Sequence, residues 1–370
     1  MCILTLRLPA CLPSFALFAL SLAACQAPAG KEDPASTADP DGTEPTPGDV
    51  APGDGPEAPG GAAPGEDTGA SDGETGETGG ETGDPGEAPV GVGSCDAWDE
   101  PLAVAEVTDG ALTELSDLVP SRANPGVLWG HQDSGGEPIL YAIDGATGDT
   151  LGTLTLLGVD NSDWEDLAVA PCPGAAGDCV WVGDVGDNGL SRDDVALHTV
   201  PEPTFAGTLD AAVTPTTYRF EYPDGRGNVE GLAVGPDGLP ILVTKRVDAT
   251  ADVYRFPTLD ASATVTLAHV ARIPTGDPAN EHAAEATSAD ISPDGTRLLV
   301  RTYDSLLEYP LTDGVPGDPV SLPAPDEPQG EAAAYDPVSG GVWLTSEGTN
   351  PTVWFVACLA PARLGHELGR

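Results

Sequence analysis

The sequence has few positive charges. Its 14 lysine and arginine residues stand against 60 aspartate and glutamate residues, and the formal net charge is -46. Phosphate groups carry the same sign of charge, so this balance excludes nucleic acid as a partner. It favours cations as ligands, or a saline environment in which a high net charge keeps the protein soluble.

The sequence also lacks the patterns of three common kinds of protein. No segment repeats its apolar residues with the period of an amphipathic helix. No close Cys-x-x-Cys pair is completed by histidines at the spacing of a zinc site. No serine lies in a nucleophile turn with histidine and aspartate partners. We therefore expect neither a helical fold, nor a zinc site, nor a serine hydrolase.

Residues 1–24 have the composition of a secretory signal, with one arginine, an apolar run and then small residues. Leu22-Ala-Ala-Cys25 resembles the bacterial lipobox, in which cleavage leaves a lipid-modified cysteine as the first residue. An ordinary signal peptide cut nearby is the alternative. Gln26 follows the cysteine, where an aspartate would indicate retention in the inner membrane. We expect a protein of the bacterial cell envelope, anchored by lipid at Cys25 to the outer membrane or cell surface.

Residues 25–93 consist of Cys25 followed by a segment rich in Gly, Pro, Ala, Thr, Asp and Glu. The segment has almost no large apolar residues, so it cannot bury enough surface to offset the entropy lost on ordering. We interpret it as a disordered, self-repelling tether. The folded domain is then expected over residues 94–370, which still carry 44 acidic against 12 basic residues.

A polar residue opens a short apolar strand at five places in this domain. The five residues are Ser116, Glu165, Glu230, Thr287 and Glu331. Another polar residue lies two positions before each of them, namely Glu114, Asp163, Asn228, Glu285 and Gln329. Side chains two apart in a strand point to the same side. Each opening therefore directs two polar groups to one place, which indicates convergence on a common axis.

Three further strands follow most of these openings. Second strands are expected over residues 127–131, 180–184, 241–245, 298–302 and 342–346, and third strands over 138–143, 196–200, 252–256, 305–309 and 352–356. Fourth strands are expected over 151–156, 217–222, 265–270 and 320–322. Four-strand units that repeat every 44 to 65 residues are typical of a propeller. We predict an all-β, five-bladed β-propeller, with six blades as the alternative; an open β-sandwich would not explain five matching openings.

The fifth unit lacks a fourth strand, and a spare strand lies at the front of the domain, over residues 102–107. If this strand pairs with residues 352–356, the ring closes and the two ends of the domain come together. Four cysteines fall in the predicted folded domain. Cys95 and Cys358 lie at its two ends, and Cys172 and Cys179 flank a short Pro-Gly-Ala-Ala-Gly-Asp loop. In an oxidising compartment we expect two disulfides, Cys95–Cys358 and Cys172–Cys179.

The first strand of each propeller blade lines the central channel, so the five opening residues are expected to form a ring at one mouth. Three of them are glutamates, which cannot all stay ionised at close quarters unless their pKa values rise or a cation neutralises them. Oxygen donors without Cys or His suit Ca²⁺. We predict a calcium ion held by Ser116, Glu165, Glu230, Thr287 and Glu331; the alternative is a wet polar channel.

This order of ring residues resembles the central calcium ligands of the calcium-activated nucleotidases (apyrases), five-bladed propellers that hydrolyse nucleoside diphosphates. That family has Ser, Glu, Glu, Ser, Glu in the same order, and the stretches 114–119, 163–169 and 180–183 look like its first two blades. The resemblance covers the channel strands of residues 114–335 and implies that Asp133 is a catalytic carboxylate. The chain is also similar to bacterial lipoproteins and secreted propellers with Asp-Trp-Glu-Asp, Gly-Asp-x-Gly-Asp-Asn and Pro-Gln-Gly-Glu motifs, a grouping that implies no activity.

Basic residues are conspicuous in so acidic a domain. Lys245, Arg246 and Arg301 follow or end second strands and are candidates for gripping a phosphate or carboxylate at the mouth; salt bridges to nearby aspartates are the alternative. Two functions remain open. The first is a monomeric, lipid-anchored binding or scaffold module that takes a small molecule or surface ligand at the mouth. The second is a calcium-dependent, apyrase-like hydrolase of phosphoanhydrides or phosphoesters.

Overall fold

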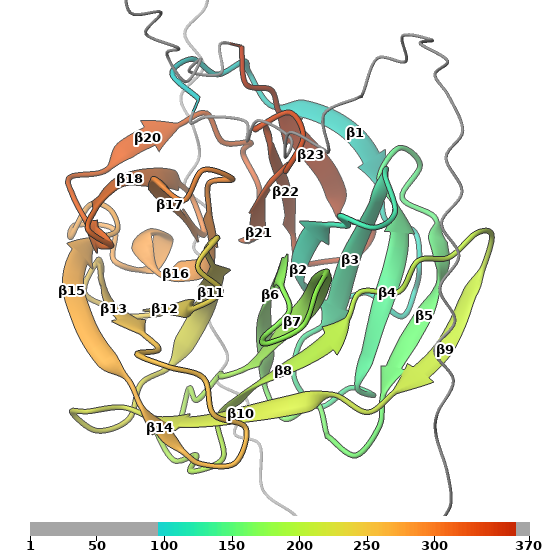
Figure 1. The fold of residues 1–370 in the computed structure, drawn as a ribbon. Coiled ribbons are helices and arrows are strands. Elements are labelled where there is room, and N and C mark those ends of the chain that lie inside the picture. Colours follow the sequence, from blue (N-terminus) through green and yellow to red (C-terminus); the bar gives the residue numbers. More distant parts are fainter. Residues whose placement is uncertain (1–94, 360–370) are drawn as a thin grey trace, which may run out of the picture. The chain divides into compact units, whose positions relative to one another are not determined.

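The computed structural model describes residues 95–359; the signal and tether predicted over residues 1–24 and 25–93, together with residues 360–370, lie outside the described residues. The described chain is all-β except for one short 3₁₀ helix, η1 (His282–Ala284). Its strands form five sheets arranged around a central axis (Figure 1). The five-bladed β-propeller predicted from the sequence is confirmed.

Each blade has four main strands, which follow one another from the axis outwards. Blade 1 consists of β2 (Leu115–Pro120), β3 (Val127–Gln132), β4 (Ile139–Asp144) and β5 (Thr150–Leu156), and blade 2 of β6 (Trp164–Pro171), β7 (Asp178–Asp184), β8 (Ala196–Pro201) and β10 (Thr216–Glu221). Blade 3 consists of β11 (Val229–Val234), β12 (Pro240–Thr244), β13 (Thr250–Arg255) and β15 (Ala268–Pro274). Blade 4 consists of β16 (Ala286–Ile291), β17 (Arg297–Thr302), β18 (Leu306–Thr312) and β20 (Val320–Leu322). The innermost strand of each blade contacts those of its two neighbours, which encloses the channel.

Blade 5 is built from both ends of the domain. Its strands are β21 (Gly330–Tyr335), β22 (Val342–Ser346), β23 (Thr352–Val356) and β1 (Leu102–Glu106). The N-terminal strand β1 pairs antiparallel with β23, as predicted. A disulfide joins Cys95 to Cys358 beside this seam, with their Cα atoms 5.7 Å apart. The second disulfide, Cys172–Cys179, closes the turn between β6 and β7.

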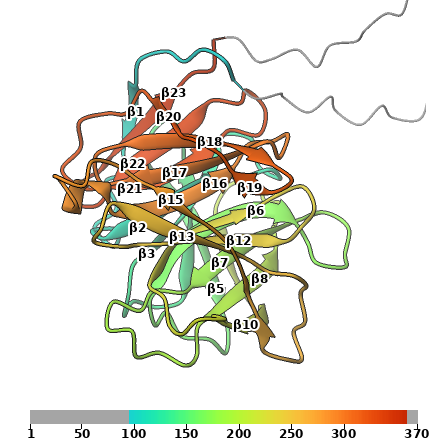
Figure 2. The ribbon, with the colours of Figure 1, turned by 90° about the vertical axis from the view of Figure 1, so that its left-hand side faces the viewer.

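The sheets of blades 1 and 2 are each extended at the outer edge by a strand that follows from the next blade along the chain. β9 (Leu209–Val213) leaves blade 2 and pairs in parallel with β5 of blade 1. β14 (Val265–Thr266) leaves blade 3 and pairs in parallel with β10 of blade 2. The fourth strand predicted over residues 265–270 is therefore split: its start belongs to blade 2, and the fourth strand of blade 3 is β15. The short β19 (Val315–Pro316) forms a hairpin with β18 (Figure 2).

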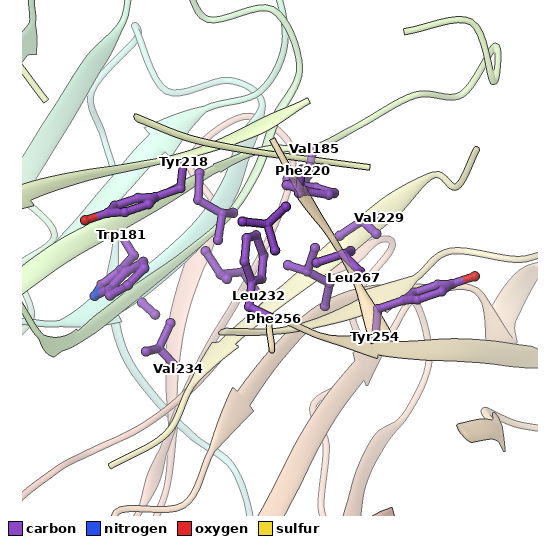
Figure 3. Packing of buried hydrophobic residues seen from close by; sticks show 14 of the residues in the cluster. Trp181, Val185, Tyr218, Phe220, Val229, Leu232, Val234, Tyr254, Phe256 and Leu267 are labelled. Carbon is purple, nitrogen blue, oxygen red and sulfur yellow. The ribbon is translucent and has the colours of Figure 1, made fainter. Parts of the chain in front are cut away.

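The hydrophobic core is divided among the five interfaces between neighbouring blades. The interface of blades 2 and 3 is rich in aromatic side chains (Figure 3). There Trp181 stacks on Tyr218, with ring centroids 6.2 Å apart, and Phe220 meets Phe256 edge to face at 5.3 Å. Fully burying one such side chain contributes about 1.5–3 kcal/mol. The blades therefore hold one another in place and fix the positions of the strand ends at the channel mouth.

Candidate functional site at the channel mouth

All five innermost strands carry a β-bulge at the same position, and the extra residue of each bulge is the one that opens the strand. In blade 2, Trp164 pairs with Asp184 and Asp166 with Gly183, so Glu165 between them has no partner in the ladder. The same interruption leaves out the corresponding residue of every other blade, namely Ser116, Glu230, Thr287 and Glu331. A bulge redirects a side chain, and in this channel it does so at one level in every blade.

A cavity of about 350 Å³ lies at this level, and we call it the mouth cavity. Four of the five predicted ring residues line it: Ser116, Glu165, Glu230 and Glu331. Each blade also contributes one residue that follows its second strand, namely Asp133, Asn188, Lys245, Tyr303 and Glu347. Glu285 and Gln329 complete the lining. Thr287 is not part of the lining; its buried hydroxyl donates to the carbonyl of Gly330 at 2.8 Å, just as the Ser116 hydroxyl donates to the carbonyl of Glu165 at 2.7 Å.

Three carboxylates converge on the side of the cavity formed by blades 1 and 2. Asp133, Asp163 and Glu165 each offer an oxygen atom, and these atoms lie within 4.8 Å of one another. Gly186 makes room for them, since a Cβ atom there would lie 2.0 Å from Oε1 of Glu165 and 2.5 Å from Oδ2 of Asp163. The Asn161 side chain secures the Asp133 loop by donating to the Asp133 carbonyl at 2.7 Å.

The opposite side of the cavity is partly neutralised by Lys245. Its Nζ lies 3.1 Å from Oε2 of Glu230 and 5.0 Å from the centre of the Tyr303 ring. Two amides support the acidic groups: Asn228 donates to Glu230 at 3.0 Å, and Gln329 donates to Glu331 at 2.8 Å. Among the described residues that line the mouth cavity, Lys245 is the only basic one, against six carboxylates.

Burial, together with the charge of neighbouring carboxylates, raises the pKa values of these acidic groups. Burial, followed by the charges of Glu230 and Asp133, raises the pKa of Glu165 well above its usual range. Burial also raises the pKa of Asp133, Asp163 and Glu331. A divalent cation would offset the mutual repulsion and favour the ionised forms. Oxygen donors of this kind fit calcium, which accepts 6–8 oxygen ligands in flexible geometry.

The structure does not bring the three predicted basic residues together. Lys245 lines the mouth cavity, whereas Arg246 bonds to Asp248 and Asp252 beside it. Arg301 lies in β17, is fully buried, and pairs with Glu327 at 2.9 Å. The structure therefore places Arg301 away from the lining of the mouth cavity. Its guanidinium lies against Gly330 of blade 5, where a Cβ atom would come within 2.0 Å of Nη2.

A second polar level, which the strand pattern did not predict, lies one residue further along the inner strands. Oδ2 of Asp166 accepts hydrogen bonds from the backbone of Leu232 in blade 3 and from Ala289 in blade 4, the latter at 3.0 Å. Asp117 accepts from the backbone of Leu167 at 2.9 Å. Burial raises the pKa of Asp117 to about 7 and that of Asp166 well above its usual range. This level ties the blades together around the axis.

Comparison with other proteins adds little to this geometry. No protein-family model and no curated protein matches the sequence. Among solved structures, the PQQ-bound aldose sugar dehydrogenase of Streptomyces coelicolor is 14% identical, covers 70% of this chain and 98% of its own, and aligns with a TM-score of 0.42. A chain of the mitotic checkpoint complex is 16% identical, with 64% and 60% covered and a TM-score of 0.33. Neither likeness carries a functional argument.

Within residues 95–359, no helix combines the length and the apolar character that crossing a bilayer requires.

Proposed function

We propose that this propeller is a binding module of the bacterial cell envelope whose channel mouth holds a calcium ion. The observation that carries the proposal is the convergence of Asp133, Asp163 and Glu165. Asp133 and Glu165 line a cavity with six carboxylates and, among its described lining residues, a single basic one. Asp163 and Asp133 are the additions to the ring predicted from the sequence. Ser116, Glu230 and Glu331 remain candidate ligands around the same cavity, while Thr287 does not line it.

Binding is better supported than phosphoryl hydrolysis. An apyrase-like reaction needs basic groups directed at the substrate phosphates, and the three basic candidates are each paired with carboxylates of the domain. Lys245 bonds to Glu230, Arg246 to two aspartates, and Arg301 is buried with Glu327. Asp133, the expected catalytic carboxylate, lies among the candidate calcium ligands. We therefore assign it to cation binding and not to a separate catalytic step.

Calcium is expected to bind one site in the purified protein, and Glu165→Gln should weaken that binding by at least about tenfold, since it removes a charge from the centre of the carboxylate group. At a hundredfold excess over Kd, calcium should stabilise the wild-type fold by about 2.7 kcal/mol. Isothermal titration calorimetry and thermal melting with and without chelator measure both effects. Glu106→Gln, an exposed change on β1, is the matched control. If neither calcium nor chelator changes the melting temperature, the mouth is a water-filled polar channel and not a calcium site.

The lipid anchor is a separate proposal, because Cys25 lies outside the described residues. It is supported by the Leu22-Ala-Ala-Cys25 sequence after an apolar run and by Gln26 at the following position. Mass spectrometry of the mature N-terminal peptide is expected to find acylated Cys25, and Cys25→Ser should release the protein from the membrane fraction. An unmodified N-terminus at another residue would contradict the anchor and leave the calcium proposal untouched.

A further inference from the structure

Lys245 holds a position at the mouth that an incoming ion would otherwise use. It is one of only two lysines in the sequence, with Lys31. Its Nζ lies 3.1 Å from a carboxylate oxygen of Glu230, which is itself a candidate calcium ligand, and its side chain is only 15% exposed. We propose that Lys245 is a built-in competing cation that sets the affinity of the mouth for divalent ions. This inference rests on the proposed calcium site.

The surroundings of Lys245 favour a cation at this point whether or not an ion is bound. The ammonium group lies 5.0 Å from the centre of the Tyr303 ring, within the range of a cation–π contact. A lysine side chain is charged at neutral pH, and the ion pair with Glu230 at 3.1 Å keeps this charge beside the carboxylates. Lys245 therefore supplies part of the counter-charge that they need.

A second cavity gives the lysine somewhere to move. A groove of about 430 Å³ runs beside the mouth cavity and is lined in part by Arg246, Asp248 and Tyr254. Three residues line both this groove and the mouth cavity: Asn188, Lys245 and Glu285. Lys245 therefore lies on the wall that the two cavities share. When a divalent ion draws Glu230 into its coordination, the ammonium group can turn out of the mouth cavity into this groove.

The competition has a direct electrostatic basis. A unit positive charge within a few ångströms of an ion repels it strongly in a partly buried site. Removing that charge leaves six carboxylates and no basic side chain among the described residues of the lining. Calcium should then bind more tightly, even though the apo form loses one ion pair. An alternative role, in which Lys245 braces Glu230 for calcium, predicts weaker binding when the lysine is removed.

The test compares Lys245→Met with Arg219→Met by calcium titration calorimetry on the full chain. Arg219 is exposed on β10 and lines neither the mouth cavity nor the groove, so its loss changes the net charge equally without altering either of them. We expect Lys245→Met to bind calcium about tenfold more tightly or better, and Arg219→Met to match the wild type. Lys245→Gln serves the same purpose if the methionine variant does not fold.

A second measurement follows the lysine itself. Protein labelled with ¹³C at lysine Cε gives two signals, and Lys245→Met identifies which of them belongs to Lys245. Calcium should shift the Lys245 signal and leave that of Lys31 in place. Equal or weaker calcium binding by Lys245→Met, with the wild type binding normally, would overturn the inference but not the proposed function. If the wild type binds no calcium, both are refuted together.

Discussion

Replacing Cys95 and Cys358 together by serine is expected to lower the free energy of unfolding by about 5 kcal/mol. The disulfide closes a loop with a sequence separation of 263 residues, and on the chain-entropy model the stabilisation grows with the length of the closed loop. The β1–β23 pairing remains, but it no longer has a covalent bond beside it. Urea denaturation under oxidising conditions measures the loss.

The double variant Cys172→Ser/Cys179→Ser is the matched control, because its disulfide spans a separation of only seven residues. The same model gives about 2.5 kcal/mol for so short a loop. Equal losses from the two double variants would show that closure of the ring does not depend on the bond between its ends.

Asp166→Ala is expected to destabilise the protein by about 3–5 kcal/mol. The carboxylate accepts backbone hydrogen bonds from Leu232 and Ala289, so its removal leaves donors of two other blades buried without an acceptor. Each unsatisfied buried group costs about 1–3 kcal/mol. Asp166→Asn keeps an acceptor oxygen and should cost about 1 kcal/mol. Chemical denaturation compares the variants; equal losses from both would mean that the charge of Asp166 matters and its role as an acceptor does not.

The fold could be predicted because its repeat is local. Each inner strand is short, apolar and opened by a polar residue, and the number of these openings is the number of blades. Closure could be predicted as well, since one missing strand at the C-terminal end and one spare strand at the N-terminal end had to meet. The cross-blade strands β9 and β14 could not, because a short apolar run such as Val265–Thr266 carries no information about which sheet edge it joins.

The mouth was predicted in outline and not in detail. Four ring residues line the cavity, but no feature of the sequence shows that Thr287 is not among them. The hydroxyls of Ser116 and Thr287 have the same donors and acceptors, and both donate to a backbone carbonyl of the next blade. The sequence shows Asp163 as the polar residue two positions before Glu165. Only the bulge and the space left by Gly186 reveal that the Asp163 carboxylate lies beside that of Glu165. Register shifts of this kind have no single-sequence signal.

The strands exchanged between blades also determine how the domain can come apart. Blade 1 is completed by β9 from blade 2, blade 2 by β14 from blade 3, and blade 5 by β1 from the opposite end of the domain. No truncation at a blade boundary within blades 1 to 3 leaves every remaining sheet whole. Proteolytic removal of a blade, or a premature stop at such a boundary, leaves a strand edge with unpaired backbone groups, which is a template for aggregation. Partial degradation of this domain is therefore expected to leave aggregation-prone sheet edges, so the ring has to be retained or degraded as a whole.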